Sequence, residues 1–314
     1  MKIKLIMILS VMIFCWELWA EDDLAGTSGF AFLKINYSAR ATAMGNAYTA
    51  LADNADAVFF NPAGLQAMNK PQATVSYLNY FEGIQAGSFS YFRAYNKNLK
   101  YAAFMQYMSG SETRTLSDPN GEYLGEDGTF GFSNTVMGLG GSYYINPLIT
   151  VGANVKFLID ILDQNSASAL AVDLAILHQT TNDNLKLGVA LKNFGTQISS
   201  YTESDYEEDL PNTISVGFSY NPNEKFYANL DVNKPLAGDY AAHVGLEYQI
   251  HELLALRSGY KSKAEDWKAG GDLEIFSGIS LGLGFAWKQY LFDYAIASYG
   301  DLGFINNFTL TYHF

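Results

Sequence analysis

The stretch that decides the fold is Ile149-Thr150-Val151-Gly152-Ala153-Asn154-Val155-Lys156-Phe157-Leu158-Ile159-Asp160. Its odd-numbered positions are all apolar, whereas most of its even-numbered positions are polar or glycine. A period of two places these two kinds of residue on opposite faces of a β-strand. Strands of about nine to eleven residues match a tilted crossing of the hydrocarbon layer, while strands of globular proteins cluster near five or six. The stretch therefore predicts a strand that separates two environments and could cross a membrane.

The same alternation returns at residues 185–192 and 226–233, and the connections between such runs alternate in length. Short connections contain the residue types of tight hairpins. We expect them at Asn96-Lys97-Asn98, Asn146-Pro147, Asn182-Asp183-Asn184, Asn221-Pro222-Asn223, His251-Glu252 and Lys288-Gln289. Longer polar connections are expected at residues 110–131, 162–166, 194–210, 235–239, 263–277 and 299–306. Alternating short turns and long loops are typical of an up-and-down barrel in an outer membrane.

The number of strands tests this interpretation. Counting every extended segment gives fifteen strands, one of which is residues 267–275. Bacterial single-chain barrels have an even number of strands, so we assign this segment to an outer loop. The sequence then predicts an all-β fold: a transmembrane antiparallel β-barrel of about fourteen strands over residues 71–314.

The composition agrees with a protein that does not face water everywhere. Charged residues make up 16% of the 314 residues, against about 25% in an average soluble domain. The net charge is −13, and no basic patch offsets it. The surface therefore repels nucleic acid, and we exclude nucleic acid as a partner. An alternative to the membrane barrel is a soluble secreted β-sandwich, but a sandwich would not need such long strands.

The first twenty residues have the pattern of a secretory signal peptide. Lys2 and Lys4 precede an uncharged apolar stretch that ends near Ala20, before an acidic start at residue 21. The alternative, a membrane anchor, needs about 18 to 20 apolar residues, more than this stretch has. We therefore predict a signal peptide at residues 1–20 and an exported chain. Its single cysteine is Cys15, so the exported chain has no disulfide.

The last strand, residues 308–314, has apolar residues at alternate positions and ends on a terminal Phe. Outer-membrane barrels resemble this pattern closely. We predict that Tyr312 and Phe314 form the signal read by the barrel-insertion machinery. The alternative is an ordinary last strand of a soluble sandwich. The expected location is the outer membrane of a Gram-negative-type bacterium, with its lipid and lipopolysaccharide as partners.

Residues 21–70 do not alternate, and we predict that they form a plug inside the barrel. Small residues dominate between positions 39 and 52, which favours close packing of a short helix. The run Asn61-Pro62-Ala63-Gly64-Leu65 follows. Because Pro62 fixes its own φ and Gly64 permits a positive φ, we expect a tight turn there.

Arg40 is the single cation among the small residues of this plug. An unpaired buried guanidinium would be costly. Our hypothesis is that Arg40 pairs with Asp53 or Asp56 and thereby locks the plug.

Two stretches also resemble a known family. At the start these are Gly26-Thr27-Ser28-Gly29, Phe32-Leu33-Lys34-Ile35, Ala39-Arg40, Ala43-Met44-Gly45, Ala47, Ala52-Asp53 and Asn61-Pro62-Ala63-Gly64-Leu65; at the end they are Leu291-Phe292-Asp293-Tyr294-Ala295 and Tyr299-Gly300-Asp301-Leu302-Gly303. These residues resemble the PorV/PorQ family of outer-membrane proteins, which is related to the FadL-type transporters of hydrophobic compounds. The run Phe304-Ile305-Asn306-Asn307 departs from the polar and basic run that usually follows in that family.

The resemblance implies a fourteen-stranded barrel with an N-terminal plug, in which the turn at residues 61–65 lies near the substrate path. It also implies a role in protein secretion or surface attachment of the type IX kind, with secreted cargo proteins or a surface attachment complex as partners. The alternative that the resemblance leaves open is a FadL-like channel for the uptake of hydrophobic small molecules, with residues 61–65 as a gate.

No motif indicates an enzyme, a metal site or a cofactor. His178, His243, His251 and His313 are far apart and have no cysteine partners, so no zinc spacing exists. The string Gly278-Ile279-Ser280-Leu281-Gly282 matches a nucleophile elbow, but that motif requires a strand, a turn and a helix, and here the alternation continues. Residues 118–128 carry acidic and amide side chains but lack the glycine at the sixth position of an EF-hand loop, so a solvated outer loop is the preferred interpretation.

The sequence also contains one acidic cluster, for which two interpretations remain open. It consists of Glu203, Asp205, Glu207, Glu208 and Asp209 in a predicted long loop. These carboxylates could bridge through divalent ions to lipopolysaccharide phosphates, or they could simply form a solvated loop.

Overall fold

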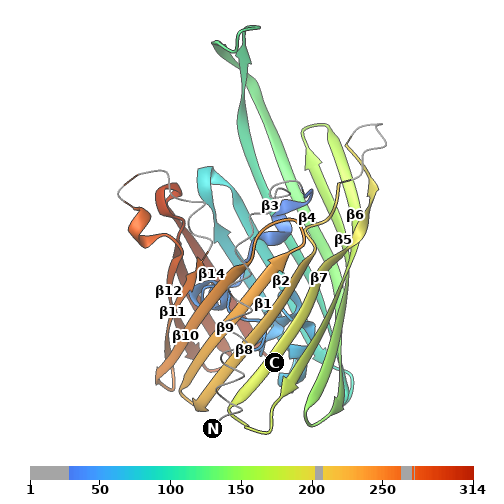
Figure 1. The fold of residues 1–314 in the computed structure, drawn as a ribbon, viewed down its shortest axis with the longest axis vertical. Helices are drawn as coiled ribbons and strands as arrows, with labels where there is room; N and C mark the ends of the chain where they lie inside the picture. Colours follow the sequence, from blue (N-terminus) through green and yellow to red (C-terminus); the bar gives the residue numbers. More distant parts are fainter. Residues whose placement is uncertain (1–27, 202–207, 263–270, 272) are drawn as a thin grey trace.

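A closed antiparallel barrel of fourteen strands dominates the computed structural model, which describes residues 28–201, 208–262, 271 and 273–314 (Figure 1). The predicted signal peptide lies outside the described residues. Each strand pairs with its neighbours in the chain, and β1 also pairs with β14 to close the barrel. The strands are β1 Gln72–Asn79, β2 Gln85–Ala94, β3 Leu99–Ser117, β4 Tyr123–Asn146, β5 Ile149–Leu162, β6 Asn165–Gln179, β7 Leu185–Ser199, β8 Thr213–Asn223, β9 Phe226–Pro235, β10 Ala241–His251, β11 Leu254–Lys261, β12 Ile279–Trp287, β13 Tyr290–Ser298 and β14 Phe304–His313. The predicted fold class is confirmed.

The two faces of the wall are opposite to those of a soluble barrel. On β12, Leu281 and Leu283 point outward and are 54% and 47% exposed, while the neighbouring Ser280 points inward and is 1% exposed. The other strands repeat this arrangement, with large apolar side chains outside and mostly small or polar ones inside. Among the inward exceptions that pack against the plug are Leu78, Phe92 and Phe104. The period-two pattern of the sequence has this cause: one face packs on a filled lumen, and the other is apolar but uncovered by protein.

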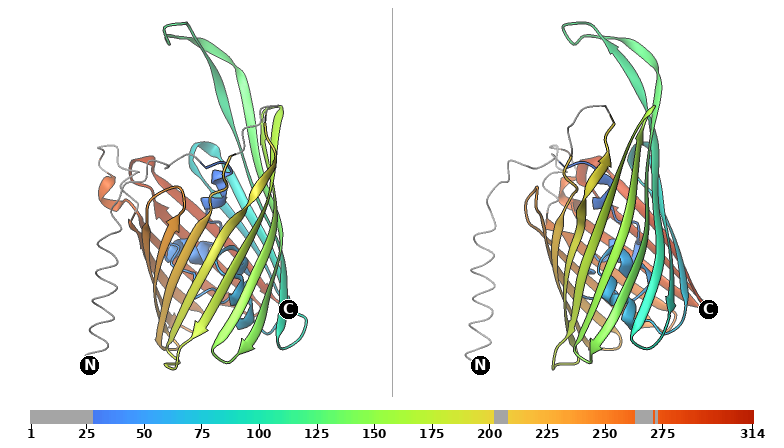
Figure 2. Two further views of the ribbon diagram at one scale, coloured as in Figure 1. Left: turned by 45° about the vertical axis from the view of Figure 1, so that its right-hand side comes forward. Right: turned by 90° about the vertical axis from the view of Figure 1, so that its right-hand side faces the viewer.

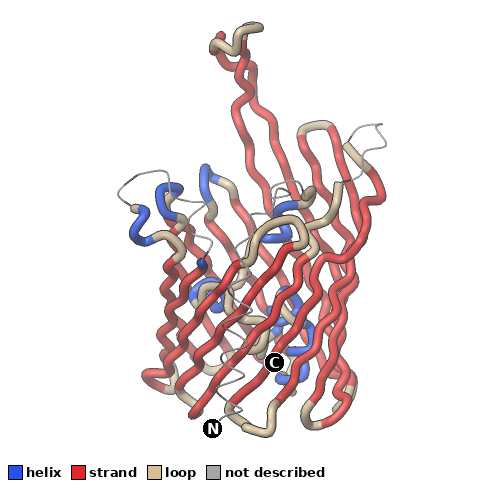
Figure 3. Tube along the Cα trace, viewed as in Figure 1, coloured by secondary structure: helices blue, strands red, loops and turns tan. Residues whose placement is uncertain are grey.

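The connections differ in length as the sequence predicts, with small shifts and two larger corrections. Strand β7 extends to Ser199, β8 extends to Asn223 and β14 begins at Phe304, each inside a predicted connection. Short turns gather at the lower end of the barrel in Figure 3, and the other connections lie at the upper end. Residues 110–131, predicted to be a loop, mostly continue β3 and β4, and only residues 118–122 connect them. This hairpin stands far above the rim (Figures 1 and 2). Its sequence loses the alternation because both of its faces are exposed there, although the backbone pairing continues.

The second correction concerns residues 162–166. Strand β5 ends at Leu162 and β6 begins at Asn165, so the connection is a tight turn in which Asp163 has a φ of 55°. Acidic and amide side chains tolerate this left-handed conformation, which is why a polar run of this kind need not be a long loop. The segment at residues 267–275 lies between β11 and β12, and its described part contains the helical turn Glu274–Phe276 and no strand.

The plug lies inside the barrel (Figure 2). Its described helical pieces are η1 Ala31–Lys34, α2 Ala39–Ala43, η2 Ala55–Phe59 and η3 Pro62–Ala67; the short turns η4 Phe81–Gly83, η6 Glu274–Phe276 and η7 Gly300–Leu302 lie in connections between strands. The short helix predicted within residues 39–52 is present as α2. It ends after one turn because Gly45 and Asn46 adopt φ values of 61° and 65°. None of the helices in the described part of the chain has the length and hydropathy of a membrane span.

Candidate functional site

The plug contacts the wall backbone to backbone, and glycines on the inner face make this possible. A Cβ atom at Gly152 of β5 would lie 2.2 Å from the backbone nitrogen of Ala63. Three other inward glycines, Gly188, Gly245 and Gly259, would meet plug backbone atoms at 2.0–2.5 Å in the same way. A Cβ at Gly217 would lie 2.9 Å from the Ala50 nitrogen, and one at Gly282 would lie 2.4 Å from the Ala43 Cβ. Only glycine permits such an approach, so six strands fix the position of the plug.

The predicted turn at residues 61–65 is the start of the helical turn η3. Asn61 caps it, because its Oδ1 accepts a hydrogen bond from the Ala63 amide at 3.1 Å. Its Nδ2 donates to the carbonyl oxygens of Thr49 at 2.9 Å and Ile176 at 3.3 Å, which ties the turn to the plug and to β6. Pro62 occupies the first helical position, which suits its fixed φ.

Gly64 is required for a different reason than the sequence suggested. Its backbone is helical, and its φ is not in the left-handed region. A Cβ there would lie 1.9 Å from the carbonyl oxygen of Ala52. The close crossing of two plug segments therefore requires this glycine. Ala63 and Leu65 on either side of it are completely buried.

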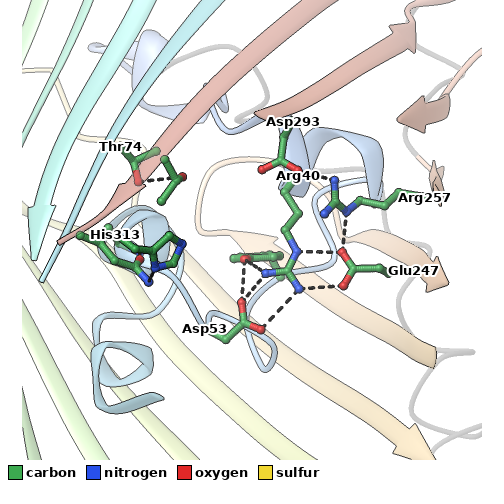
Figure 4. A network of polar contacts seen from close by, with 11 residues as sticks. Arg40, Asp53, Thr74, Glu247, Arg257, Asp293 and His313 are labelled. Atoms are coloured by element: carbon green, nitrogen blue, oxygen red, sulfur yellow. Dashed lines mark hydrogen bonds and ion pairs between the residues drawn. The ribbon is translucent and has the colours of Figure 1, made fainter. Parts of the chain in front are cut away.

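Arg40 joins the plug to the wall (Figure 4). Its Nη1 lies 2.6 Å from Asp53 Oδ1, as the hypothesis requires for one of the two candidate partners. Its Nε and Nη2 donate to the two carboxylate oxygens of Glu247 on β10, at 2.8 and 2.9 Å. Asp56 does not contact Arg40 and accepts a hydrogen bond from Ser90 of β2 instead.

The ion pair is part of a larger network that the sequence did not indicate. Arg257 of β11 donates to Glu247 at 2.5 Å and to Asp293 of β13 at 2.6 Å, and all three side chains are buried. Two guanidinium groups thus share three carboxylates, counting Asp53. The signal that could have found them is an ionisable residue at an inward position of an alternating strand, such as Arg257 between Leu256 and Ser258.

Asp56 is the second buried carboxylate of the plug. It is completely buried, and burial raises the pKa of its carboxyl to about 6, while the hydrogen bond from Ser90 opposes the rise. The hydrogen-bond partner of Asp56 is thus a neutral hydroxyl, whereas Asp53 pairs with the Arg40 guanidinium.

A cavity of about 400 Å³ lies between the plug and the wall. Its apolar side is formed by Val58, Phe59 and Phe60 of the plug and Phe104 of β3. The rings of Phe59 and Phe104 meet edge to face, with centroids 5.4 Å apart.

The polar side of the cavity is built at a β-bulge. Asp173 of β6 lies opposite two residues of β7, Lys192 and Asn193, and Asn193 has a φ of 66°. The Asp173 carboxylate accepts a hydrogen bond from the Asn193 amide at 2.7 Å and pairs with the Lys156 ammonium at 2.6 Å. The bulge turns two successive side chains of β7 toward the cavity. Among them, Lys192 forms no hydrogen bond to the described residues and lies in the field of Asp173 and Asp231.

The remaining candidates have structural surroundings. Ser280, within the elbow-like string, accepts a hydrogen bond from the Gly45 amide and donates to the Ala43 carbonyl, both at 3.2 Å. Residues 118–122 form the tip of the long hairpin. The four histidines do not meet, and the described residues contain no group of three or more His, Cys, Asp or Glu side chains that could hold a metal.

Two predicted features lie at the ends of the barrel. Tyr312 and Phe314 contact each other edge to face at 4.8 Å, beside Tyr290 and Tyr91. Of the acidic cluster, Glu203, Asp205 and Glu207 lie outside the described residues. Glu208 and Asp209 hold the connection after β7 through backbone hydrogen bonds to Gln197 and Gly29.

Comparison with known proteins identifies the fold. No protein-family model matches the sequence, and no curated protein matches it either. The Pseudomonas putida toluene transporter TodX is 14% identical, with a TM-score of 0.64 over 88% of this chain and 98% of TodX. The monoaromatic hydrocarbon channel CymD is 12% identical, with a TM-score of 0.64 over 89% and 98%. A Pseudomonas aeruginosa FadL homologue is 13% identical, with a TM-score of 0.56 over 92% and 98%. The chain therefore has a fold similar to that of FadL-type barrels, which include hydrocarbon channels.

Proposed function

We propose that this protein is an outer-membrane channel for small hydrophobic molecules, the alternative that the resemblance left open. The observation that carries the proposal is the cavity of about 400 Å³ inside a closed barrel, with aromatic rings on one side and Lys192 on the other. Ligand cavities of proteins have a similar volume and, like this one, combine aromatic rings with polar groups that can orient a ligand. Polar and charged residues make up more than half of this lining, with the aromatic rings gathered at Phe59, Phe60 and Phe104.

The outer surface supports the location. Large apolar side chains cover the outside of the wall and stay exposed in the described chain, as expected for a surface that faces lipid. In this location, Tyr312 and Phe314 would serve the insertion machinery, and lipopolysaccharide would surround the upper rim.

The cavity suits an amphipathic or weakly polar molecule. Phe59, Phe60 and Phe104 remove the apolar part of the ligand from water. Lys192 and Asn193 face the same space and offer hydrogen-bond donors to a polar group. The plug, which Arg40 and the inner glycines tie to the wall, closes the straight route through the lumen, so the ligand passes beside it.

Uptake of radiolabelled toluene by cells tests the proposal. Cells that express the chain in a strain without its own hydrocarbon channels should take up toluene faster than cells with the empty vector. Ala241→Trp fills the cavity from β10 and should lower the rate about tenfold. The adjacent Ala242 points outward, so Ala242→Trp is the matched control and should leave the rate unchanged. Uptake equal to that of the empty vector would contradict the proposal.

A second candidate is the secretion or surface-attachment role that the PorV/PorQ resemblance implies. The feature that favours it is the β3–β4 hairpin, which stands above the rim where an external protein could bind (Figure 2). A tag at residues 118–122 should then recover secreted cargo proteins that share a C-terminal domain. Recovery of the barrel alone would remove this candidate.

A further inference from the structure

One aromatic ring of the cavity lies in the space that a side chain on the next strand would fill. Phe104 of β3 is directly opposite Gly138 of β4. A Cβ atom at Gly138 would lie 2.2 Å from Cζ of the Phe104 ring and 2.6 Å from a second ring carbon. The ring therefore lies flat against the wall only because residue 138 has no side chain.

The same ring forms part of the cavity surface. Phe104 lines the cavity and contacts the ring of Phe59 at 5.4 Å, whereas Gly138 does not line it. Gly138 is also opposite Lys156 of β5, another lining residue. A side chain at residue 138 would therefore touch one residue of the apolar side and one of the polar side of the cavity. It would change the cavity through these neighbours, without itself contacting the ligand.

Packed residues border the Phe104 ring along its own wall, and the cavity borders it elsewhere. Ala102 and Val136, inward residues next to Phe104 and Gly138 on their strands, are 1% and 0% exposed and belong to the packed core. The cavity is the open space beside the ring. A methyl group at residue 138 would push the ring into that space, because the atoms in its way are the far end of a flexible side chain.

We propose that Gly138 sets the largest apolar group that the cavity admits, by leaving the space in which the Phe104 ring lies against the wall. This inference rests on the proposed channel function and adds a positioning residue that determines its size limit. The ring of Phe104 selects the ligand, and Gly138 selects the position of the ring.

The test measures uptake of toluene, naphthalene and phenanthrene, which share their chemistry and differ in size. Gly138→Ala should lower uptake of the largest compound that the unmodified chain admits by about tenfold and change uptake of a smaller one by less than about twofold. Gly141→Ala on the same strand is the matched control, because a Cβ there would meet only the Lys100 carbonyl oxygen, at an ordinary 3.6 Å. Heat-dependent migration on gels reports whether each barrel is folded.

Phe104→Leu supplies the second half of the test. Combined with Gly138→Ala, it should restore uptake of the larger compound, because the shorter side chain no longer competes with the added methyl group. Alone, it should shift the size limit upward, which keeps the proposal testable if Gly138→Ala does not fold. An unchanged size limit in Phe104→Leu, or in a folded Gly138→Ala barrel, would overturn the role of Gly138 and leave the channel intact. Absence of all uptake by the unmodified chain would instead overturn the channel.

Discussion

Arg40 shows how much one side chain can connect. It binds Glu247 through two parallel hydrogen bonds, binds Asp53, and donates to the hydroxyl of Tyr48 at 3.1 Å. A buried guanidinium with this many partners stabilises the plug. Removing the guanidinium is costly, because the carboxylates stay buried without their cation. The network therefore stabilises one position of the plug relative to β10, β11 and β13.

We expect Arg40→Ala to lower the free energy of unfolding by about 3 kcal/mol or more. Arg40→Lys should cost nearly as much, because an ammonium group cannot reproduce the paired hydrogen bonds to Glu247. Urea unfolding in lipid vesicles measures both values. The control is Arg114→Ala, which removes an exposed ion pair with Asp163 and should cost less than about 1 kcal/mol. Full stability of Arg40→Lys would contradict a role for the paired geometry.

The residues of this network also show what the sequence can and cannot predict. Asp53 was found as a candidate because it lies 13 positions from Arg40, within the same short plug. Glu247 lies 207 positions away, and its distance from Arg40 depends on how the closed barrel places β10 against the plug. Local sequence patterns carry no information about which strand of the closed barrel lies against the plug. The other members of the network, Arg257 and Asp293, were missed for the same reason.

At the scale of elements, the inner glycines and the plug form one interface. In the sequence these glycines are simply small residues of alternating strands. Only the structure shows that the plug backbone packs against them and leaves no room for a Cβ atom. The strands themselves were predictable, because outside and inside differ in polarity at every second residue. The hairpin was not, because its residues have the same surroundings on both faces.

Gly152→Ala tests the interface between the plug and the wall. The added methyl would overlap the Ala63 amide and the Pro62 carbonyl carbon, at 2.2 and 2.4 Å, and backbone atoms cannot move aside as a ring can. We expect a loss of about 1 to 3 kcal/mol, the usual cost of overpacking, and a displaced plug.

Labelling of a cysteine reports that displacement. Ala55→Cys places a thiol at a completely buried position at the start of the η2 turn of the plug. A maleimide should label it faster when Gly152→Ala is present, and at the original rate when Gly141→Ala is present instead. Equal labelling rates in all three chains would mean that the plug does not depend on the close contact at Gly152.

At the scale of the whole molecule, the hairpin and the barrel are separable. In the strand ladder, residues 112–117 and 123–130 pair only with each other, because β2 stops at Gln85 opposite Ser109 and β5 stops at Leu162 opposite Phe132. The exposed ion pair of Arg114 with Asp163 is a contact of the hairpin with the neighbouring turn. A two-stranded ribbon of this kind has little stability of its own. We expect replacement of residues 112–130 by Asn-Gly, a two-residue turn between Ser111 and Gly131, to change the free energy of unfolding by less than about 1 kcal/mol. A larger loss in urea unfolding would mean that the hairpin supports the wall.

The position of the plug within the chain has a consequence for the order of assembly. The plug precedes every strand in the sequence, yet Ala39 donates a hydrogen bond to Thr309 on the last strand, 270 positions later. Glu247 and Ser280, two further anchors, also belong to the last third of the chain, whereas Ser90 on β2 and Ile176 on β6 lie earlier. The plug must therefore wait for the last strands before all of its charged and polar groups have their partners. Docking of the plug and closure of the barrel become a single event in time.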